Sequence, residues 1–224
     1  MAEIIAIILI LLTLLTIFCL YKMLDKRGLY FCLVILDLIA FVLTFKISYV
    51  FKMNINLGII PLIATFTVMY IFLNKYNAKE TKNLLTITFY SNITAALLLM
   101  IMNYFIPAIT ETISINMKGT FGYNFKILIS YPIIMLLSQL ATVKLYNLLK
   151  QLQDNNSISI ALTYIITGLI YTVGFFSIAY INIIEFRYSL FMAISTYILG
   201  LAITIVNIIF VNLINSKKVK KWET

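Results

Sequence analysis

Seven stretches of mostly apolar residues constrain this chain more than any other feature of its sequence. They cover residues 4–21, 29–50, 55–73, 84–106, 125–145, 158–181 and 189–213. A helix needs about 20 such residues to cross the roughly 30 Å hydrocarbon core of a membrane. Because 62% of the 224 residues are hydrophobic and only 11% are charged, one soluble core could not bury them. We therefore predict an all-α, polytopic membrane helix bundle of about seven transmembrane helices, forming a single integral membrane domain over residues 1–224.

The distribution of lysine and arginine predicts the orientation of this bundle. If the N-terminus lies outside and the C-terminus inside, twelve cationic residues fall on the cytoplasmic side and five on the outer side. The inner ones are Lys22, Lys26, Arg27, Lys75, Lys79, Lys82, Lys144, Lys150 and the four lysines of a basic cytoplasmic tail over residues 214–224. The outer ones are Lys46, Lys52, Lys118, Lys126 and Arg187. This bias favours the N-out, C-in arrangement. The net charge of +9 is then a consequence of membrane topology. We therefore predict the lipid bilayer, and not nucleic acid, as the partner.

Several classes of active site are missing from the sequence. The chain has no histidine, which removes most metal sites and the usual general base. No P-loop, H-E-x-x-H or G-x-S-x-G pattern occurs. Since the eight acidic residues fall mostly in loops, paired carboxylates for catalysis are not expected either. We predict a protein that is not an enzyme and that uses no metal ion and no cofactor.

Two charged residues fall inside the second apolar stretch. Asp37 lies eight residues into it, about 12 Å along a helix with a rise of 1.5 Å per residue, and so near mid-membrane. A charge there is costly, so Asp37 is either a protonated acid bonded to a neighbouring helix or a contact for substrate or for a proton. Lys46 lies nine residues further on, about half a turn around the axis from Asp37, where its side chain can reach the outer membrane surface.

Polar and small residues recur at helical spacing in five of the apolar stretches. They are Thr67, Tyr70, Asn74 and Asn77; Asn92 and Asn103; Ser138, Gln139 and Thr142; Thr163, Thr167, Tyr171 and Gly174; and Thr196, Gly200, Thr204 and Asn207. Residues three or four positions apart share one face of a helix. Such stripes either serve as helix-packing seams or enclose a polar cavity.

The order of several motifs resembles the VUT family of vitamin-uptake and queuosine-precursor transporters of bacteria and archaea. The similar segments are "YKMLDKRGLYF", "AFVLTFK", "LGIIPLIATF", "FTVMYIFLNKYNAKE", "SQLATVKLYNLLK" and "TGLIYTVGFFSIAY". The resemblance implies a transporter fold in a bacterial or archaeal cell membrane, with several membrane passes. It also implies a small-molecule substrate, and the chain could work with an energising membrane partner or as a homo-oligomer.

The chain departs from the family pattern mainly at acidic positions. Where the family has Asp and Glu in its third helix, this chain has Tyr70 and Asn74, and the Asp of its two S-Q-x-x-D copies is replaced by Thr142 and Tyr171. From the residues and the resemblance together we predict a binding site formed by Asp37, Lys46, Tyr70, Asn74, Ser138, Gln139 and Tyr171.

The expected function is uptake of a small polar solute, such as a 7-deazaguanine queuosine precursor or a related nucleobase or vitamin. The alternative is a non-transporting membrane subunit or accessory protein that retains the transporter scaffold. The loss of the acidic positions favours this alternative, because a few buried polar contacts decide specificity for such solutes.

Overall fold

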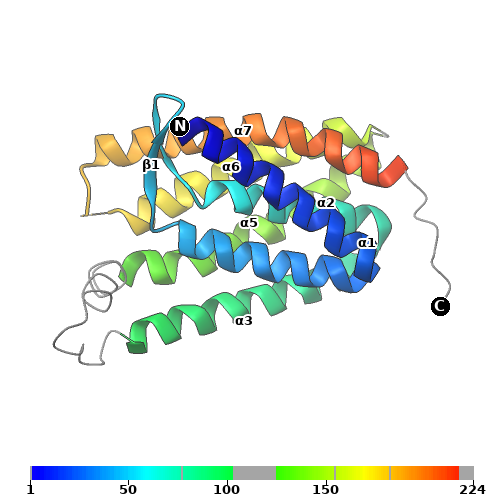
Figure 1. Cartoon of the computed structure of the whole chain (residues 1–224), viewed down its shortest axis with the longest axis horizontal. Helices are drawn as coiled ribbons and strands as arrows, with labels where there is room; N and C mark the ends of the chain where they lie inside the picture. Colours follow the sequence, from blue (N-terminus) through cyan, green and yellow to red (C-terminus); the bar gives the residue numbers. More distant parts are fainter. Residues whose placement is uncertain (1, 77, 103–124, 154, 182, 217–224) are drawn as a thin grey trace.

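The chain folds into a bundle of parallel and antiparallel helices with one small sheet. The computed structural model describes residues 2–76, 78–102, 125–153, 155–181 and 183–216. The helices are α1 (Ala2–Leu43), α2 (Ile59–Lys75), α3 (Ala78–Met102), α5 (Phe125–Leu152), α6 (Asn156–Ala179) and α7 (Phe186–Ser216), and the strands are β1 (Ile47–Val50) and β2 (Met53–Asn56). The helices run side by side along one direction (Figure 1).

The predicted helical membrane bundle is confirmed in its main features. Within the described residues, five helices are long and apolar enough to cross a membrane: α1, α3, α5, α6 and α7. The remaining helix, α2, is apolar but has only 17 residues, which is the lower limit for a membrane span. The number of seven crossings therefore stays a prediction.

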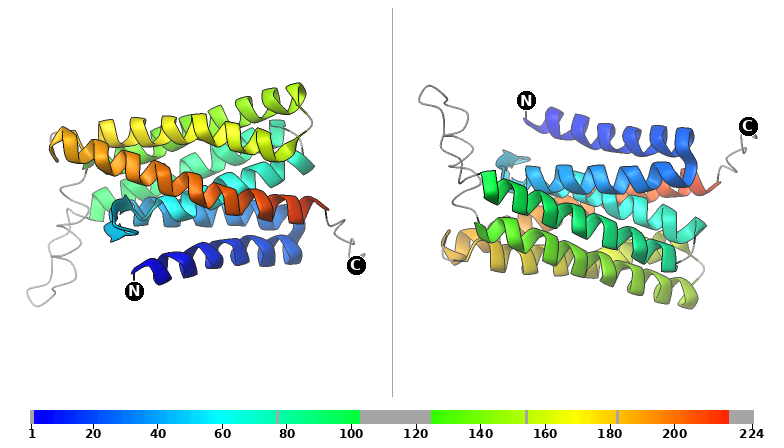
Figure 2. Two further views of the ribbon diagram at one scale, coloured as in Figure 1. Left: turned by 90° about the horizontal axis from the view of Figure 1, so that it is seen from above. Right: turned by 90° about the horizontal axis from the view of Figure 1, so that it is seen from below.

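Helix α1 folds back on itself at Asp25. This residue has φ 47° and ψ −122°, outside the helical region, and it separates two arms that lie beside each other in opposite directions (Figure 2). Gly28 permits the close approach of the arms, because a Cβ atom there would lie 2.0 Å from the carbonyl oxygen of Leu20. The segment between the apolar stretches 4–21 and 29–50 is thus helical except for this one residue.

A β-hairpin occupies residues 47–56, where the sequence predicts the end of one helix and the start of the next. The first helix ends at Leu43 and not near residue 50, and α2 begins at Ile59 and not at residue 55. Strand β1 pairs with β2 in antiparallel register, and the two turn residues, Phe51 and Lys52, have φ values of 50° and 60°. Positive φ at both turn positions matches the twist of two adjacent strands. The all-α class therefore holds apart from this short hairpin, and the two flanking helices are shorter than predicted.

Asn56 attaches the hairpin to the helices. Its Nδ2 donates a hydrogen bond of 2.9 Å to the Thr44 carbonyl oxygen, and its Oδ1 accepts one of 2.8 Å from the backbone N–H of Gly58. The backbone N–H of Asn56 donates to Thr196 Oγ1 of α7 at 3.2 Å. One side chain thus joins the end of α1, the start of α2 and the sheet.

Replacing Asn56 by alanine is expected to lower the free energy of unfolding by about 2 kcal/mol, because two buried backbone groups lose their partners. The matched control is Asn54→Ala on the same strand, where the side chain is exposed and the change should cost less than about 0.5 kcal/mol. Chemical unfolding of the purified proteins in detergent measures both values. Equal losses for the two variants would contradict this role of Asn56.

Helix α2 lies at the centre of the bundle. Every residue from Ile59 to Leu73 is buried, and the helix contacts α1, α3, α5 and α7. The helices around it instead present large apolar side chains to the outside; examples are Ile4, Leu98, Leu137, Val173 and Ile205. An apolar exterior around a closed set of helices is stable in lipid and not in water. This arrangement is typical of a membrane bundle.

The predicted inner cations gather at one end of the bundle. The turn within α1, the ends of α2 and α5 and the starts of α3 and α6 lie at that end, and the hairpin, the end of α6 and the start of α7 lie at the other (Figure 1). At the first end Lys26 pairs with Glu80 at 2.7 Å, and Lys75 Nζ donates to Tyr21 OH at 2.8 Å. We call it the basic end. Residues 217–224 of the expected tail lie outside the described residues, and the orientation in the membrane stays a prediction.

Candidate functional site

A buried carboxylate joins three helices inside the bundle. Asp37, on the second arm of α1, is only 1% exposed. Its Oδ2 accepts a hydrogen bond of 2.9 Å from Asn92 Nδ2 of α3, and its Oδ1 accepts one of 2.9 Å from Tyr131 OH of α5. The side chain of Gln139, also on α5, lies near the same carboxyl group without forming a hydrogen bond to it. We call these four residues the Asp37 cluster; its bonds match the interpretation of Asp37 as an acid bonded to neighbouring helices.

Five buried tyrosines extend from this cluster toward the basic end. They are Tyr131, Tyr171, Tyr164, Tyr70 and Tyr146, in the order that their positions along α2, α5 and α6 give. The ring centroids of Tyr131 and Tyr171 are 6.4 Å apart, and those of Tyr70 and Tyr146 are 5.3 Å apart. Tyr164 lies near both Tyr70 and Tyr171. The interior between α2, α5 and α6 is therefore lined by aromatic rings that carry polar ends.

Several polar atoms in this interior have no hydrogen-bond partner. Among the described residues they include the hydroxyls of Tyr70 and Tyr164, Oδ1 of Asn92 and of Asn207, and Nε2 of Gln139. All five side chains are at most 3% exposed. Leaving a buried donor or acceptor unpaired costs about 1–3 kcal/mol, so such groups are rare unless a ligand or water binds them. The unpaired atoms are therefore candidate contacts for a solute or for water.

The position of Tyr164 depends on two glycines. A Cβ atom at Gly200 of α7 would lie 2.0 Å from the Tyr164 hydroxyl, and one at Gly168 of α6 would lie 2.9 Å from its ring. Both distances are too short for a real side chain. The absence of side chains at these positions thus makes room for the phenol, whose hydroxyl remains unpaired.

A second polar cluster closes the bundle near the basic end. Oδ1 of Asn74 accepts hydrogen bonds from Tyr146 OH, at 2.9 Å, and from Lys150 Nζ. Nδ2 of Asn74 donates to Asn156 Oδ1 at 3.2 Å, and Asn156 Nδ2 donates to Asn212 Oδ1 at 3.2 Å. We call these five residues the Asn74 cluster. It ties α2, α5, α6 and α7 together below the row of tyrosines.

The structure brings most of the predicted site residues into one interior, but not all. Asp37 and Gln139 are in the Asp37 cluster, Tyr70 and Tyr171 are in the row of tyrosines, and Asn74 is the centre of the second cluster. Ser138 is buried beside Gln139, but its hydroxyl donates to the Met135 carbonyl oxygen of its own helix at 2.9 Å. Lys46 is exposed between α1 and β1, so it lies outside this interior and is not helical as predicted.

Two tyrosines outside the predicted site extend the polar stripe of α5. Tyr131 lies seven residues before Ser138, and Tyr146 lies four residues after Thr142, which keeps both on the same helix face. Extending the stripe by one or two turns in each direction would have included both tyrosines. Asn92 was identified as polar, but nothing in one sequence indicates that its partner is Asp37.

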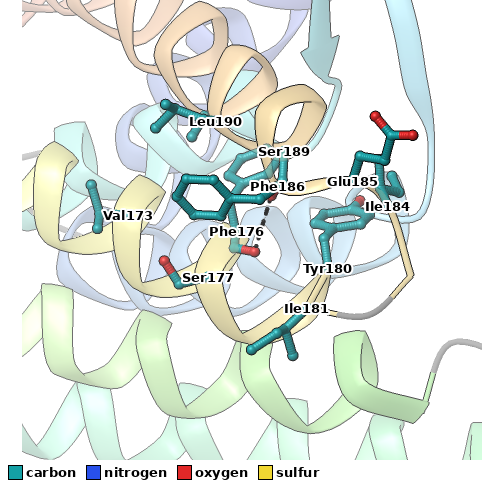
Figure 3. Close-up of a pocket in the computed structure, with 11 residues that line it drawn as sticks. Val173, Phe176, Ser177, Tyr180, Ile181, Ile184, Glu185, Phe186, Ser189 and Leu190 are labelled. Atoms are coloured by element: carbon teal, nitrogen blue, oxygen red, sulfur yellow. Dashed lines mark hydrogen bonds between the residues drawn. The ribbon is translucent and has the colours of Figure 1, made fainter.

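A surface pocket at the end opposite the basic end has different properties. Its volume is about 500 Å³, and it lies between the end of α6 and the start of α7 (Figure 3). Its lining is mostly apolar and aromatic, including Phe176, Tyr180 and Phe186, and Glu185 supplies the one carboxylate among the lining residues. Ser189 Oγ donates to the Phe176 carbonyl oxygen at 3.3 Å across its wall. None of the residues of the Asp37 cluster lines it, so the buried interior is the better candidate site.

Comparison with known proteins identifies a family. The family described as "Putative vitamin uptake transporter" matches residues 56–214, which is more than two thirds of the chain. Neither the curated proteins nor the solved structures give a match. The matched residues include the Asn74 cluster and helices α3 and α5, whose side chains donate hydrogen bonds to Asp37. Asp37 and Lys46 themselves precede the match. The chain therefore belongs to the family of "Putative vitamin uptake transporter" proteins, as the resemblance of its sequence motifs predicts.

Proposed function

We propose that this protein is an uptake transporter for a small, planar, polar solute. A 7-deazaguanine queuosine precursor is the first candidate, and related nucleobases and vitamins are the next. The observation that carries the proposal is the set of buried, unpaired polar atoms on Tyr70, Tyr164, Asn92, Gln139 and Asn207 inside a membrane bundle. The family match supports the coarser part of the proposal, a transporter of small molecules.

The chemistry of the interior fits such a solute. Tyrosine rings offer flat apolar faces for an aromatic ring, and their hydroxyls supply hydrogen bonds at the edge. A site whose buried polar groups are unpaired when empty discriminates strongly, because a solute without matching donors and acceptors leaves them unpaired. In the N-out, C-in orientation that we propose, the Asn74 cluster lies at the cytoplasmic end and would have to open to release the solute.

Replacing Tyr164 by phenylalanine is expected to reduce uptake of radiolabelled 7-deazaguanine at low concentration by about tenfold, the equivalent of one hydrogen bond. Tyr90→Phe is the matched control, since Tyr90 is 64% exposed on α3 and removal of its hydroxyl should not change uptake. Whole-cell uptake at equal expression measures both variants. Equal uptake by Tyr164→Phe and the unmodified protein would exclude the hydroxyl as a solute contact.

The alternative, an accessory subunit without transport, predicts a different result. A purified transporter should be stabilised against heat by the solute it binds, because only the folded state binds it. No stabilisation by 7-deazaguanines, nucleobases or vitamins, together with no uptake, would favour the accessory role. Copurification of an ATPase would instead indicate that uptake depends on an energising partner.

A further inference from the structure

We propose that Asp37 is the proton-binding site that couples transport to a proton gradient. This inference rests on the proposed transport function and names its energy source. It follows from three observations on the Asp37 carboxyl group. No cation lies beside it in the described residues, Asn92 and Tyr131 donate hydrogen bonds to it, and Asn92 Oδ1 next to it is an unpaired acceptor.

The groups that face Asp37 come from α3, α5 and α6, and none of them carries a positive charge. They are Asn92, Tyr131, Gln139 and Tyr171. Helix α2 also packs against α1 and has two titratable residues. Tyr70 belongs to the row of tyrosines, and Lys75 donates a hydrogen bond to Tyr21 at the basic end. The charged residues of α3, Lys79, Glu80 and Lys82, lie in the first turns of that helix at the basic end. On β1, the titratable residue Tyr49 is exposed. Within the described residues, Asp37 thus has no ion-pair partner.

A carboxylate in this position is neutralised most readily by a proton. A buried charge without a partner is strongly unfavourable in a membrane interior, and two neutral donors compensate for only part of the lost hydration. The neutral acid has no such cost, but its new O–H needs an acceptor. A side chain that serves both states would let Asp37 take up and release a proton while its carboxyl group keeps both hydrogen bonds.

Asn92 has the atoms for this exchange. Its Nδ2 donates to Asp37 Oδ2, and its Oδ1 is buried and unpaired. A half-turn of the amide group exchanges the two atoms, so Oδ1 then faces the carboxyl group and accepts a bond from the protonated Oδ2. Tyr131 donates to Oδ1 of Asp37 in either state. The ionised and the neutral acid are therefore both hydrogen-bonded.

The proposed cycle conserves charge and atoms. A proton from the outer solution forms an O–H bond at Oδ2 of Asp37 when the solute binds, and no electron moves. After the interior opens to the cytoplasm, this O–H bond breaks and the proton leaves with the solute. The pH difference across the membrane is the driving force, and the carboxylate is restored for the next cycle.

Transport by proteoliposomes tests the coupling. With radiolabelled 7-deazaguanine outside, the membrane potential clamped at zero and the lumen about one pH unit more alkaline, one proton per solute supports up to about tenfold accumulation. Asp37→Asn keeps the shape but not the titration, so we expect no accumulation above equilibrium while exchange of internal for external solute continues. Glu80→Gln, the same chemical change at the basic end, should accumulate solute like the unmodified protein.

Infrared spectroscopy of the purified protein gives a readout that needs no substrate. A change from about pH 9 to about pH 5 should produce the band of a protonated carboxyl group that is absent in Asp37→Asn and present in Glu80→Gln. Accumulation by Asp37→Asn equal to that of the unmodified protein would overturn the proposal, as would an infrared band that Asp37→Asn retains. If the unmodified protein transports none of the probes but shows the band, the proton site stands and the proposed substrate class is wrong.

Discussion

Alanine at position 28 is expected to lower the free energy of unfolding by on the order of 3 kcal/mol, because the new methyl group cannot fit. A Cβ atom at Gly28 would lie 2.0 Å from the Leu20 carbonyl oxygen and 2.5 Å from its carbon. These are backbone atoms of the first arm of α1, which cannot rotate away as a side chain would. The two arms must move apart, and the second arm carries Asp37. Thermal and chemical unfolding of the purified protein in detergent measures the loss.

Gly174→Ala is the matched control for this change. A Cβ atom at Gly174 meets only the side chain of Ile134, at 3.3 Å, and that side chain can shift. Because alanine also favours the helix over glycine by about 1 kcal/mol, the control should be neutral or stabilising. Similar destabilisation by Gly28→Ala and Gly174→Ala would show that the arms of α1 are not in the close contact described.

Alanine at position 200 is expected to displace Tyr164 and to lower the free energy of unfolding by about 2 kcal/mol. The added methyl group would lie 2.0 Å from the Tyr164 hydroxyl, and the ring lies so close to Gly168 that even a Cβ atom there would be 2.9 Å from it. Uptake should fall with stability, since the hydroxyl is one of the proposed solute contacts. The physical cause is a clash with the hydroxyl oxygen of Tyr164, and the substitution Tyr164→Phe removes that atom alone.

The double variant Gly200→Ala with Tyr164→Phe isolates that clash. Without the hydroxyl, the nearest atom to the new methyl group is the ring carbon Cζ at 3.1 Å, which needs only a small shift. The cost of Gly200→Ala should therefore be smaller in the phenylalanine background by about 1–2 kcal/mol, a direct coupling between residues in contact. Unfolding of the four proteins gives this difference. Additive costs would mean that the two residues do not touch.

Apolar length and periodicity predicted most of the fold because the membrane imposes them. Each helix buries its backbone hydrogen bonds in lipid, so the stretch at 125–145 predicts α5 and the stretch at 158–181 predicts α6 to within a few residues at most ends. The hairpin was missed for a specific reason. Its turn is formed by Phe51 and Lys52, whereas the sequence signal for such turns is Asn-Gly or Asp-Gly.

Contacts between distant segments limited the prediction of the candidate site. Asp37 was identified because a carboxylate in an apolar helix is conspicuous, but its partners lie 55 and 94 residues away along the chain. Only packing determines which faces of α3 and α5 turn toward it. Lys46 was placed in the site because it matches a polar position of the family motif, but in the structure its side chain is exposed between α1 and β1.

The enclosure of α2 on all sides also implies an order of assembly during synthesis. Its neighbours α1 and α3 are adjacent in sequence, whereas α7, which contacts both α2 and β2, is made after the other described helices. Until α7 inserts, the face of α2 that receives Asn207 at the Ile63 carbonyl oxygen is exposed to lipid, and the N–H of Asn56 lacks its Thr196 partner. Insertion of α7 would thus be the event that covers this face of α2.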